Sequence, residues 1–368
     1  MVPRGLWTEM KKKVRLFLLK MLQGTGNFDV WRRTHEKDIV ILMFHGTPNP
    51  LRASTWTPLR LHIPTDYIDW CLGFIGNYYN FISLDEAVGI LKGEKPSVKN
   101  GLVVTLDDGY RNNIIDALPV FRKHGAPITI FLPVSSINNR KPLWFDRLDY
   151  ALQFADVEKH VFEIGGKHFK FSSGGRERLA SSYSQFRELI KKQYTDELEF
   201  NMKLEEVSSK FERASGKRLE SIFENDPWSA LLSWEEISKI QGNGVSFGSH
   251  TMDHYRVGHL DENQLRYQFA NSKSMIEKVT GNACKHIAYP DGNYSETAVS
   301  IGMECGFDAG LTTTEGINKI GCEIMTLKRI SVPLTSDPTE LMAYTSGFSG
   351  ALSKILKFYK ISNPGISQ

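Results

Sequence analysis

Two adjacent carboxylates follow a short apolar run. The segment VVTLDDGY at 103–110 places Asp107 and Asp108 directly after residues typical of a buried strand, and Gly109 comes next. Neighbouring side chains in a regular strand point to opposite faces, so both carboxylates can face one mouth only if the strand breaks at this glycine. Like charges this close repel each other, and a nearby cation would stabilise them. An ordinary Asp-Asp-Gly turn is the alternative interpretation.

Two histidines that could bind such a cation lie four residues apart. FGSHTMDH at 247–254 also follows a strand-like run and contains His250 and His254. On a helical turn this spacing would place both imidazoles on one face. With one aspartate they would form a three-ligand site with open positions, which suits catalytic zinc or another first-row divalent ion. HTMDH lacks the glutamate of HExxH, which argues against a metalloprotease.

The elements around these residues indicate a parallel sheet. Short strand-like runs occur at 39–44, 102–106, 128–132, 245–248, 286–290, 308–312 and 324–332. Helical patterns separate them, for example at 115–125 and 262–281. Apolar strands that alternate with helices indicate an α/β fold with a covered parallel sheet, whose catalytic groups lie at the C-terminal strand ends. We expect a closed or partly closed β/α barrel, with a doubly wound open sheet as the alternative.

A long interruption separates the third strand from the fourth. It contains a predicted hairpin at 160–171 and charged helical stretches, and a capping box at 233–236 returns the chain to the barrel. We expect an N-terminal amphipathic helical extension at 1–37 and a barrel formed by 38–142 together with 233–335. An inserted subdomain or lid would span 143–232, and a C-terminal helical extension would span 336–368.

Composition limits the classes of partner. The 368 residues are 41% hydrophobic, which is enough for a substantial core. A net charge of +3 is close to balance and argues against nucleic acid as a partner, since nucleic-acid binders usually carry a concentrated basic face. The four cysteines are scattered without a CxxC pair, which suits a reducing compartment.

The N-terminal segment KKKVRLFLLKML at 11–22 has a basic start and an apolar body. Arg15 and Lys20 interrupt the apolar run, which is too short to span a bilayer, and no cleavage site follows cleanly. It is interpreted as an amphipathic helix that either contacts a membrane surface through residues 8–22 or docks on the protein's own body. The stretch 353–360 has the same ambiguity. We expect a cytoplasmic location. If the N-terminal helix contacts a membrane, the protein would lie peripherally at the inner face of that membrane.

At this point the sequence resembles a known family. TLDDGY at 105–110 together with SHTMDH at 249–254 is similar to the first two motifs of the polysaccharide deacetylases, the NodB-homology group of metal-dependent carbohydrate esterases. AYPDGNY at 288–294 fits the same order, and the resemblance covers 38–140 and 233–333. It implies a distorted (β/α)7-type barrel, here with an inserted α+β subdomain.

The resemblance also implies roles for individual residues. Asp108, His250 and His254 would bind a divalent metal, with Zn²⁺ expected and Co²⁺ or Ni²⁺ as alternatives. Asp107 would be the general base that takes a proton from the attacking water. The backbone N–H of Tyr110 would help to hold the oxyanion.

Two positions depart from the family pattern. The third motif usually carries an arginine that orients the base, and this chain has Ala288 there. The fifth motif usually carries a histidine as general acid, and the corresponding stretch contains Arg329. One branch of the family looks permuted, with the acid on an early strand, and FHGT at 44–47 fits that variant. We therefore expect His45 as the acid and Arg329 as the partner of Asp107.

Further residues are candidates for substrate binding. Tyr289 and Asp291 lie in the AYPDGNY segment, where Asp291 could bind substrate or only form the turn. Trp144, Phe145, Asp146 and Arg147 stand where the insertion leaves the barrel, and of these Trp144, Asp146 and Arg147 are the candidate contacts. An aromatic ring beside polar groups suits sugar binding, although a lid hinge or simple packing would use the same residues.

The expected activity is removal of the acetyl group from an N-acetylated sugar, in a cell-surface polysaccharide or its lipid-linked precursor. One alternative is a carbohydrate O-deacetylase, because an ester leaves more easily and depends less on a strong acid. Another is a catalytically inactive glycan-binding relative, given the altered third and fifth motifs. The intact base and three ligands favour an enzyme.

Overall fold

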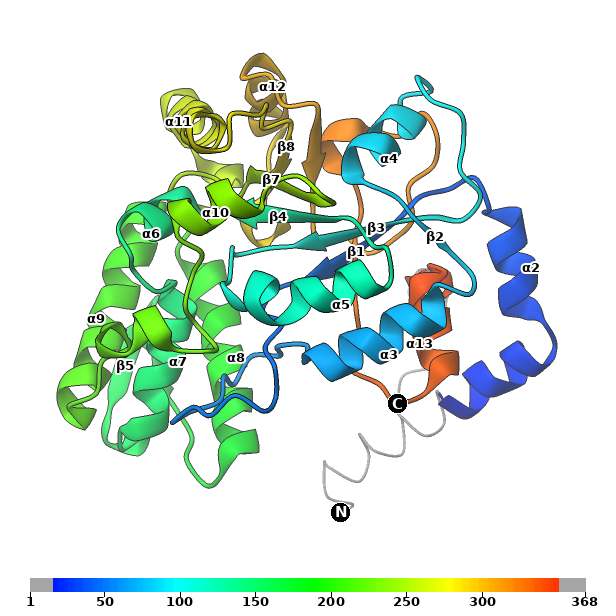
Figure 1. The fold of residues 1–368 in the computed structure, drawn as a ribbon. Coiled ribbons are helices and arrows are strands. Elements are labelled where there is room, and N and C mark those ends of the chain that lie inside the picture. Colours follow the sequence, from blue (N-terminus) through cyan, green and yellow to red (C-terminus); the bar gives the residue numbers. More distant parts are fainter. Residues whose placement is uncertain (1–15, 351–368) are drawn as a thin grey trace, which may run out of the picture.

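The computed structural model describes residues 16–350, and a curled parallel sheet forms its centre (Figure 1). The sheet has the strand order β10-β1-β3-β4-β7-β8-β9, and β2 pairs with β3 beside this path. The strands are β1 Val40–Phe44, β2 Asn80–Phe81, β3 Gly101–Leu106, β4 Ile128–Leu132, β7 Val245–Ser249, β8 His286–Ala288, β9 Ala309–Leu311 and β10 Ile330–Ser331. Their pairings are all parallel, so their C-terminal ends share one edge.

One segment touches both ends of the sheet. Leu327 forms a parallel bridge with Leu311 of β9, and Ile330 pairs with Leu42 of β1 three residues later. The two ends therefore curl toward each other, which confirms the distorted barrel and not the doubly wound open sheet. A strand over 324–332 was the wrong expectation, because Ile324–Thr326 form a 3₁₀ turn in which the Glu323 carboxylate accepts the Met325 N–H.

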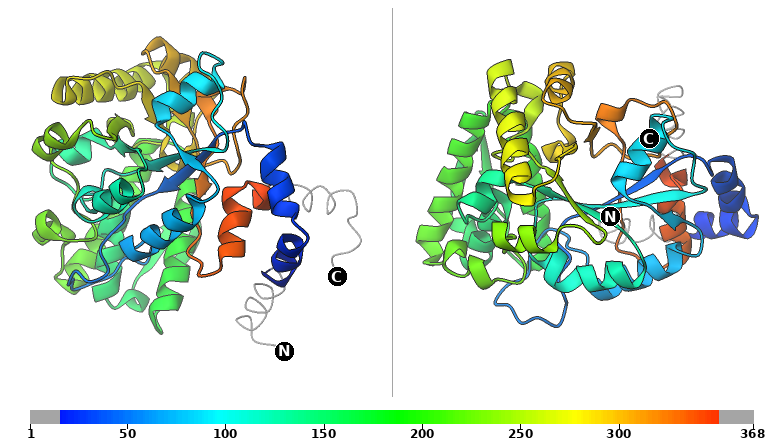
Figure 2. Two further views of the ribbon diagram at one scale, coloured as in Figure 1. Left: turned by 45° about the vertical axis from the view of Figure 1, so that its right-hand side comes forward. Right: turned by 45° about the horizontal axis from the view of Figure 1, so that its top comes forward.

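Helices cover the outside of the sheet (Figures 1 and 2). They are α3 Thr65–Ile75, α4 Leu84–Leu91, α5 Leu118–Lys123, α6 Val134–Asn138, α10 Trp234–Ile240, α11 Glu262–Thr280 and α12 Glu296–Glu304. α11 shows why such segments are helical: Asp261 and Gln264 form a capping box at its start, and Gly281 ends it in a left-handed conformation. Its Leu265 and Phe269 are buried on the face toward the barrel core.

The insertion has its own elements and core. It contains α7 Trp144–Phe154, the hairpin β5 Val161–Ile164 and β6 Lys167–Lys170, α8 Arg176–Gln193 and α9 Glu197–Ser215. Its buried aromatic residues include Phe162, Phe171, Phe186 and Phe211. The chain leaves the barrel after β4 and returns at β7, and these strands are paired neighbours. The insertion, green in Figure 1, therefore leaves from and returns to one side of the barrel, and we propose 143–232 as its extent.

The helical N-terminal segment packs on the protein itself. Residues 16–24 are helical, α2 spans Asn27–Thr34 and α13 spans Pro338–Thr345, and they lie on the side away from the insertion (Figures 1 and 2). Leu19 is buried, and Lys20 forms an ion pair with Asp337 at 2.8 Å. Phe17, Leu18 and Met21 are exposed on the same helix. The rest of the predicted membrane contact, residues 8–15, and the stretch 353–360 lie outside the described residues.

Within residues 16–350, none of the helices combines the length and the hydropathy that a bilayer crossing requires.

Candidate metal centre

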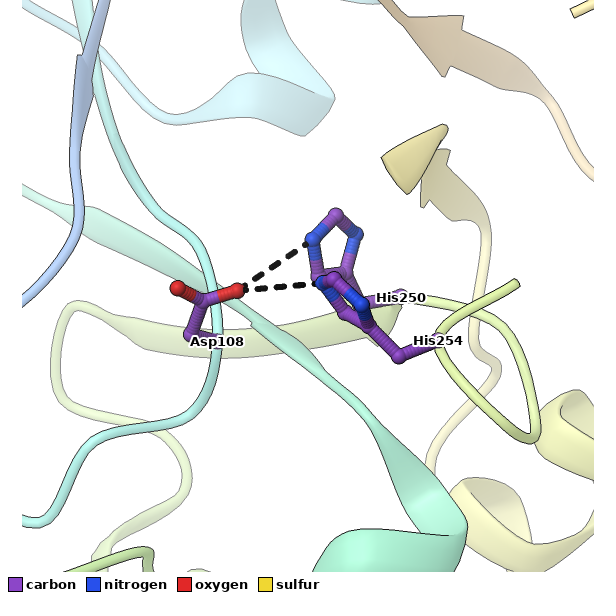
Figure 3. A group of neighbouring side chains, drawn as sticks. All are labelled: Asp108, His250 and His254. Carbon is purple, nitrogen blue, oxygen red and sulfur yellow. Dashed lines mark ion pairs between the residues drawn. The ribbon is translucent and has the colours of Figure 1, made fainter. Parts of the chain in front are cut away.

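Asp108, His250 and His254 meet at the C-terminal ends of β3 and β7 (Figure 3). The Nε2 atom of His254 lies 3.3 Å from Oδ1 of Asp108, and the Nε2 atom of His250 lies 3.6 Å from the same oxygen. One ligand atom from each residue falls within 4.8 Å of the others. The three side chains are buried or nearly so. This is the arrangement of a three-ligand site with positions left for water and substrate.

The atoms on offer suit a divalent ion. Nδ1 of His250 lies 2.8 Å from the carbonyl oxygen of Ala288, which can only accept, so Nδ1 carries the hydrogen and Nε2 presents its lone pair toward Asp108. Oδ2 of Asp108 is buried and has no hydrogen-bond partner among the described residues. A buried carboxylate oxygen without a hydrogen bond is unfavourable, and a metal ion would add to the stabilisation from Arg60, whose Nη2 lies 3.5 Å away as an ion pair. Two imidazole nitrogens and one carboxylate fit a first-row divalent ion.

Strained backbone holds these ligands in place. Asp108 has φ 74° and Gly109 has φ 63°, so the strand break expected at the glycine begins one residue earlier. Thr251 and His254 also adopt left-handed conformations, with φ 65° and 57°. Such conformations of non-glycine residues cost on the order of 1 kcal/mol or more each. The helical turn expected for 250–254 was wrong, because these two residues leave the helical region, and a loop brings the imidazoles together instead.

Asp107, the predicted base, lies against Arg329. Nη1 and Nη2 of Arg329 donate to the two carboxylate oxygens of Asp107, both at 2.7 Å, and its Nε donates to the Thr312 carbonyl at 2.8 Å. Burial alone would raise the pKa of Asp107, but the positive charge of Arg329, with help from His250, outweighs burial and lowers it. Asp107 is therefore held in the ionised state that a general base needs.

His45 follows β1 at the same mouth. Its backbone carbonyl accepts a hydrogen bond from Nδ2 of Asn113 at 2.7 Å, and the same nitrogen donates to Thr47 at 2.9 Å, which fixes this turn. Burial lowers the pKa of His45, while the charges of Asp108 and Asp107 oppose the shift. The Asp107 N–H donates to the Phe44 carbonyl at 2.9 Å, so His45 and Asp107 follow neighbouring positions of two paired strands.

The backbone of Tyr110 lies at the start of the turn that follows β3. Two hydrogen bonds bridge this turn to residues 230–232: Arg111 N–H donates to the Ala230 carbonyl at 2.8 Å, and Leu232 N–H donates to the Gly109 carbonyl at 3.0 Å. Neither of them uses the N–H of Tyr110. That donor can therefore serve the role assigned to it by the resemblance.

Arg60 joins the site although it was not among the residues selected from the sequence. Its Nη2 donates to the Tyr110 hydroxyl at 2.9 Å and lies 3.5 Å from Oδ2 of Asp108, and its guanidinium stacks 3.7 Å from the centre of the Phe145 ring. The Tyr110 hydroxyl donates in turn to Asp146 at 2.6 Å. Burial raises the pKa of Asp146 to about 7, against the effect of Arg60. Arg60 lies in an irregular loop without a motif, so no pattern could have identified it.

Asp291 lies in a tight turn and also contacts the insertion. It has φ 55° within the turn Pro290–Gly292, so the turn interpretation describes its backbone. Its carboxylate forms an ion pair with Lys191 of α8. Asp291 therefore forms the turn with its backbone and the ion pair with its side chain, and this ion pair joins the barrel mouth to the insertion.

The remaining candidates pack within the insertion or in the barrel core. Arg147 is bound by Glu212 and Glu205 of α9, at 2.6 and 2.5 Å, so its partners belong to the insertion. The ring of Trp144 packs edge to face with those of Phe145 and Phe200. Tyr289 is fully buried in the barrel core, where its ring presents no exposed face to a sugar.

Comparisons with known proteins agree with this geometry. Residues 94–310 match the sequence model of the family described as "Polysaccharide deacetylase". The chain is 21% identical over 324 residues to YxkH of Bacillus subtilis (strain 168), which carries a provisional polysaccharide deacetylase name; the match covers 88% of this chain and 81% of YxkH.

Solved structures show the same fold. The Streptococcus pyogenes deacetylase PplD, in complex with acetate, matches with a TM-score of 0.54 at 18% identity, covering 84% of this chain and 98% of PplD. IcaB from Ammonifex degensii matches with a TM-score of 0.53 at 16% identity, covering 84% of this chain and 97% of IcaB. At such identities the structural likeness establishes the fold, whereas the family model spans most of the chain and contains both ligand motifs. The chain belongs to the polysaccharide deacetylase family.

Proposed function

We propose that this protein is a metal-dependent N-deacetylase of an N-acetylated sugar, in a surface polysaccharide or its lipid-linked precursor. Family membership implies an acetylated carbohydrate as substrate. The observation that carries the proposal is the pairing of Asp107 with Arg329 directly beside the Asp108, His250 and His254 group. An ionised base next to three metal ligands is what amide hydrolysis by this route requires.

The residues divide the reaction as follows. A divalent ion, which we expect to be zinc because the donors are two imidazoles and one carboxylate, would when bound polarise the acetyl carbonyl and increase the acidity of the attacking water. The oxygen of this water bonds to the carbonyl carbon, and Asp107 accepts the proton that the water loses. Arg329 holds the carboxylate of Asp107 in position. The N–H of Tyr110 donates to the oxygen that gains negative charge.

His45 completes the reaction at the leaving group. An amine leaves far more readily as a neutral molecule than as an amide anion, so a proton must reach the nitrogen as the C–N bond breaks. His45 lies at the strand end beside the base. Because burial lowers its pKa, it takes up a proton only during the reaction, the one that Asp107 has received from the water, and passes it to the nitrogen. The products are acetate and the free amino sugar. The presence of an acid at the mouth favours N-deacetylation over O-deacetylation, which depends less on such a group.

Metal content and acetate release test the proposal together. Wild type, Asp108→Ala and His250→Ala would be purified, and acetate release from N-acetylglucosamine oligomers would be followed. We expect about one divalent ion per chain in the wild type, and loss of both metal and activity in both variants. His259→Ala, a change to an exposed histidine nearby, should retain both. A wild type that binds no metal after reconstitution would instead favour a glycan-binding relative without activity.

We also propose that the protein works in the cytoplasm, peripherally at the inner face of the membrane. The exposed side chains of Phe17, Leu18 and Met21 on the helix 16–24 support this location, because such a face can enter the headgroup region of a bilayer. A lipid-linked sugar would be available at that surface.

A further inference from the structure

Helix α8 of the insertion carries two cationic side chains one turn apart. Arg187 and Lys191 are four residues apart, so they lie on the same side of the helix. Lys191 forms an ion pair with Asp291, whose turn follows β8 of the barrel. The ion pair places this part of α8 at the barrel mouth, next to the candidate metal centre.

Arg187 has no acidic partner in the part of the chain that the structure describes, 16–350. No carboxylate of these residues forms an ion pair with it, and its Nε is buried without a hydrogen-bond partner. Its guanidinium carbon lies instead 5.8 to 6.0 Å from the ring centres of Trp144, Phe145 and Tyr183. A partly buried guanidinium with unused donors is unfavourable, and an oxyanion would satisfy it.

The ring of Phe145 connects Arg187 with the metal centre. It lies 5.7 Å from the imidazole of His254, centre to centre, and 3.7 Å from the guanidinium carbon of Arg60. Two guanidinium groups therefore contact one ring that also contacts a metal ligand. A substrate group near this ring would meet positive charge from both the barrel loop and the insertion.

The acids nearby are already engaged. Asp291 accepts from Lys191, and Asp146 accepts from Tyr110. Burial lowers the pKa of Lys191, the charge of Asp291 opposes this shift, and the charges of Arg187 and Arg60 add to it. The mutual repulsion of these three cations is what a bound anion would relieve.

We propose that Arg187, with Lys191 beside it, forms an anion subsite for a phosphate or carboxylate group carried by the substrate close to its acetylated sugar. This inference rests on the proposed function, because it assigns a class of substrate to the same site. A guanidinium can donate two parallel hydrogen bonds to either oxyanion, which a neutral glycan lacks. The negative group thereby fixes which sugar of the chain reaches the metal centre.

Direct binding tests the subsite without requiring turnover. The zinc-loaded protein, residues 1–368, would be titrated calorimetrically with three N-acetylglucosamine oligomers of equal length: one neutral, one with a terminal phosphate and one with a terminal uronate. We expect at least one of the two anionic oligomers to bind about tenfold more tightly than the neutral one. A gain in affinity of this size is what a single hydrogen-bonded contact between charged groups contributes. The comparison of phosphate with uronate identifies the source of the anion.

Variants of α8 then assign the preference to Arg187. Arg187→Gln should reduce the ratio of anionic to neutral affinity toward one, and Arg187→Lys should retain part of it because the charge remains. Arg178→Gln, the same change at an exposed position of the same helix, should leave the ratio as in wild type. Equal affinities for all three oligomers, no binding of any of them, or a preference that survives Arg187→Gln would each overturn the subsite.

Acetate release, measured in parallel, separates this inference from the proposed function. An anion preference that depends on Arg187 without acetate release would retain the subsite and contradict the deacetylase. Acetate release at equal rates and affinities from neutral and anionic oligomers would retain the deacetylase and overturn the subsite.

Discussion

Arg329 and Asp107 form a buried ion pair with two parallel hydrogen bonds of 2.7 Å, although 222 residues separate them in the sequence. The arginine comes from the segment that joins the two ends of the curled sheet, and the aspartate directly follows β3. The guanidinium reaches the base from inside the barrel, where it also contacts Thr105. We propose that this pairing takes the place of the arginine that the family pattern has where this chain has Ala288.

The first prediction concerns this ion pair. Arg329→Gln should lower the free energy of unfolding by about 3 kcal/mol or more, because it leaves the Asp107 carboxylate buried without its cation. Acetate release should be lost with it, since the base is no longer held ionised and oriented. Chemical denaturation and acetate assays check both effects. The matched control is Arg266→Gln, which breaks an exposed pair with Glu304 and should cost at most about 1 kcal/mol. Equal destabilisation by the two changes would contradict the assignment.

A second prediction separates the role of His45 from that of the base. His45→Gln should reduce acetate release from an N-acetylated sugar by about 10²-fold or more, because no acid protonates the amine. Release from an O-acetylated sugar should fall much less, because an alcohol leaves more easily. Asp107→Asn should affect both substrates, since each requires the attacking water to lose a proton. The assay is kcat/KM for the two substrates in each variant. An equal loss on amide and ester in His45→Gln would argue against a role as acid.

The sequence predicted the ligand group well because parallel strands share one edge. Asp108 and His250 each follow a strand of strongly apolar residues. Once the two strands are known to be parallel, their C-terminal ends lie at the same edge of the sheet, and the two side chains are expected to lie close together. β10 was predicted too long, because the apolar residues Ile324 and Met325 resemble a strand but form a capped turn. β2, with two residues, is too short to leave a pattern.

Arg60 and Arg187 were missed for a different physical reason. Both depend on where an irregular loop and an inserted helix are placed in space, and neither lies in a periodic or motif-like segment. Their shared neighbour, Phe145, lies in the segment 144–147 that was interpreted as a sugar contact, a lid hinge or simple packing, but nothing in the sequence placed its ring against these two arginines. Tertiary position, which only the structure provides, decides which of these side chains meets the metal centre.

A third prediction concerns metal and stability. Zinc at 100 times its dissociation constant should raise the free energy of unfolding by about 2.7 kcal/mol, because the unfolded chain does not present the three ligands together. Asp108→Asn should lose most of this gain. His124→Ala removes a histidine that pairs with Asp69 on the surface and should keep the full gain. Thermal unfolding with and without zinc measures the difference. A zinc effect as large in Asp108→Asn as in wild type would place the ion elsewhere.

A fourth prediction tests the proposed membrane contact. The triple change of Phe17, Leu18 and Met21 to serine removes exposed apolar side chains from the helix 16–24 and leaves the buried Leu19 in place. Co-sedimentation with vesicles containing anionic lipid should fall several-fold. The matched control changes Leu198 and Met202 to serine, which are equally exposed on α9 of the insertion. Unchanged partitioning of the triple variant would show that this helix is no anchor.

The fifth prediction uses His62, whose two ring nitrogens are buried without a hydrogen-bond partner in the described chain. Burial, with the charge of Arg60, lowers its pKa to about 3, so only the unfolded chain gains a proton as the pH falls below about 6.5. Stability must therefore decrease toward acid. In His62→Phe, which keeps a ring against Tyr110, the decrease between pH 7.5 and 5 should be smaller by about 2 kcal/mol. Urea unfolding of the metal-free protein at both pH values measures it, and identical decreases in the two proteins would show that His62 is protonated in the fold.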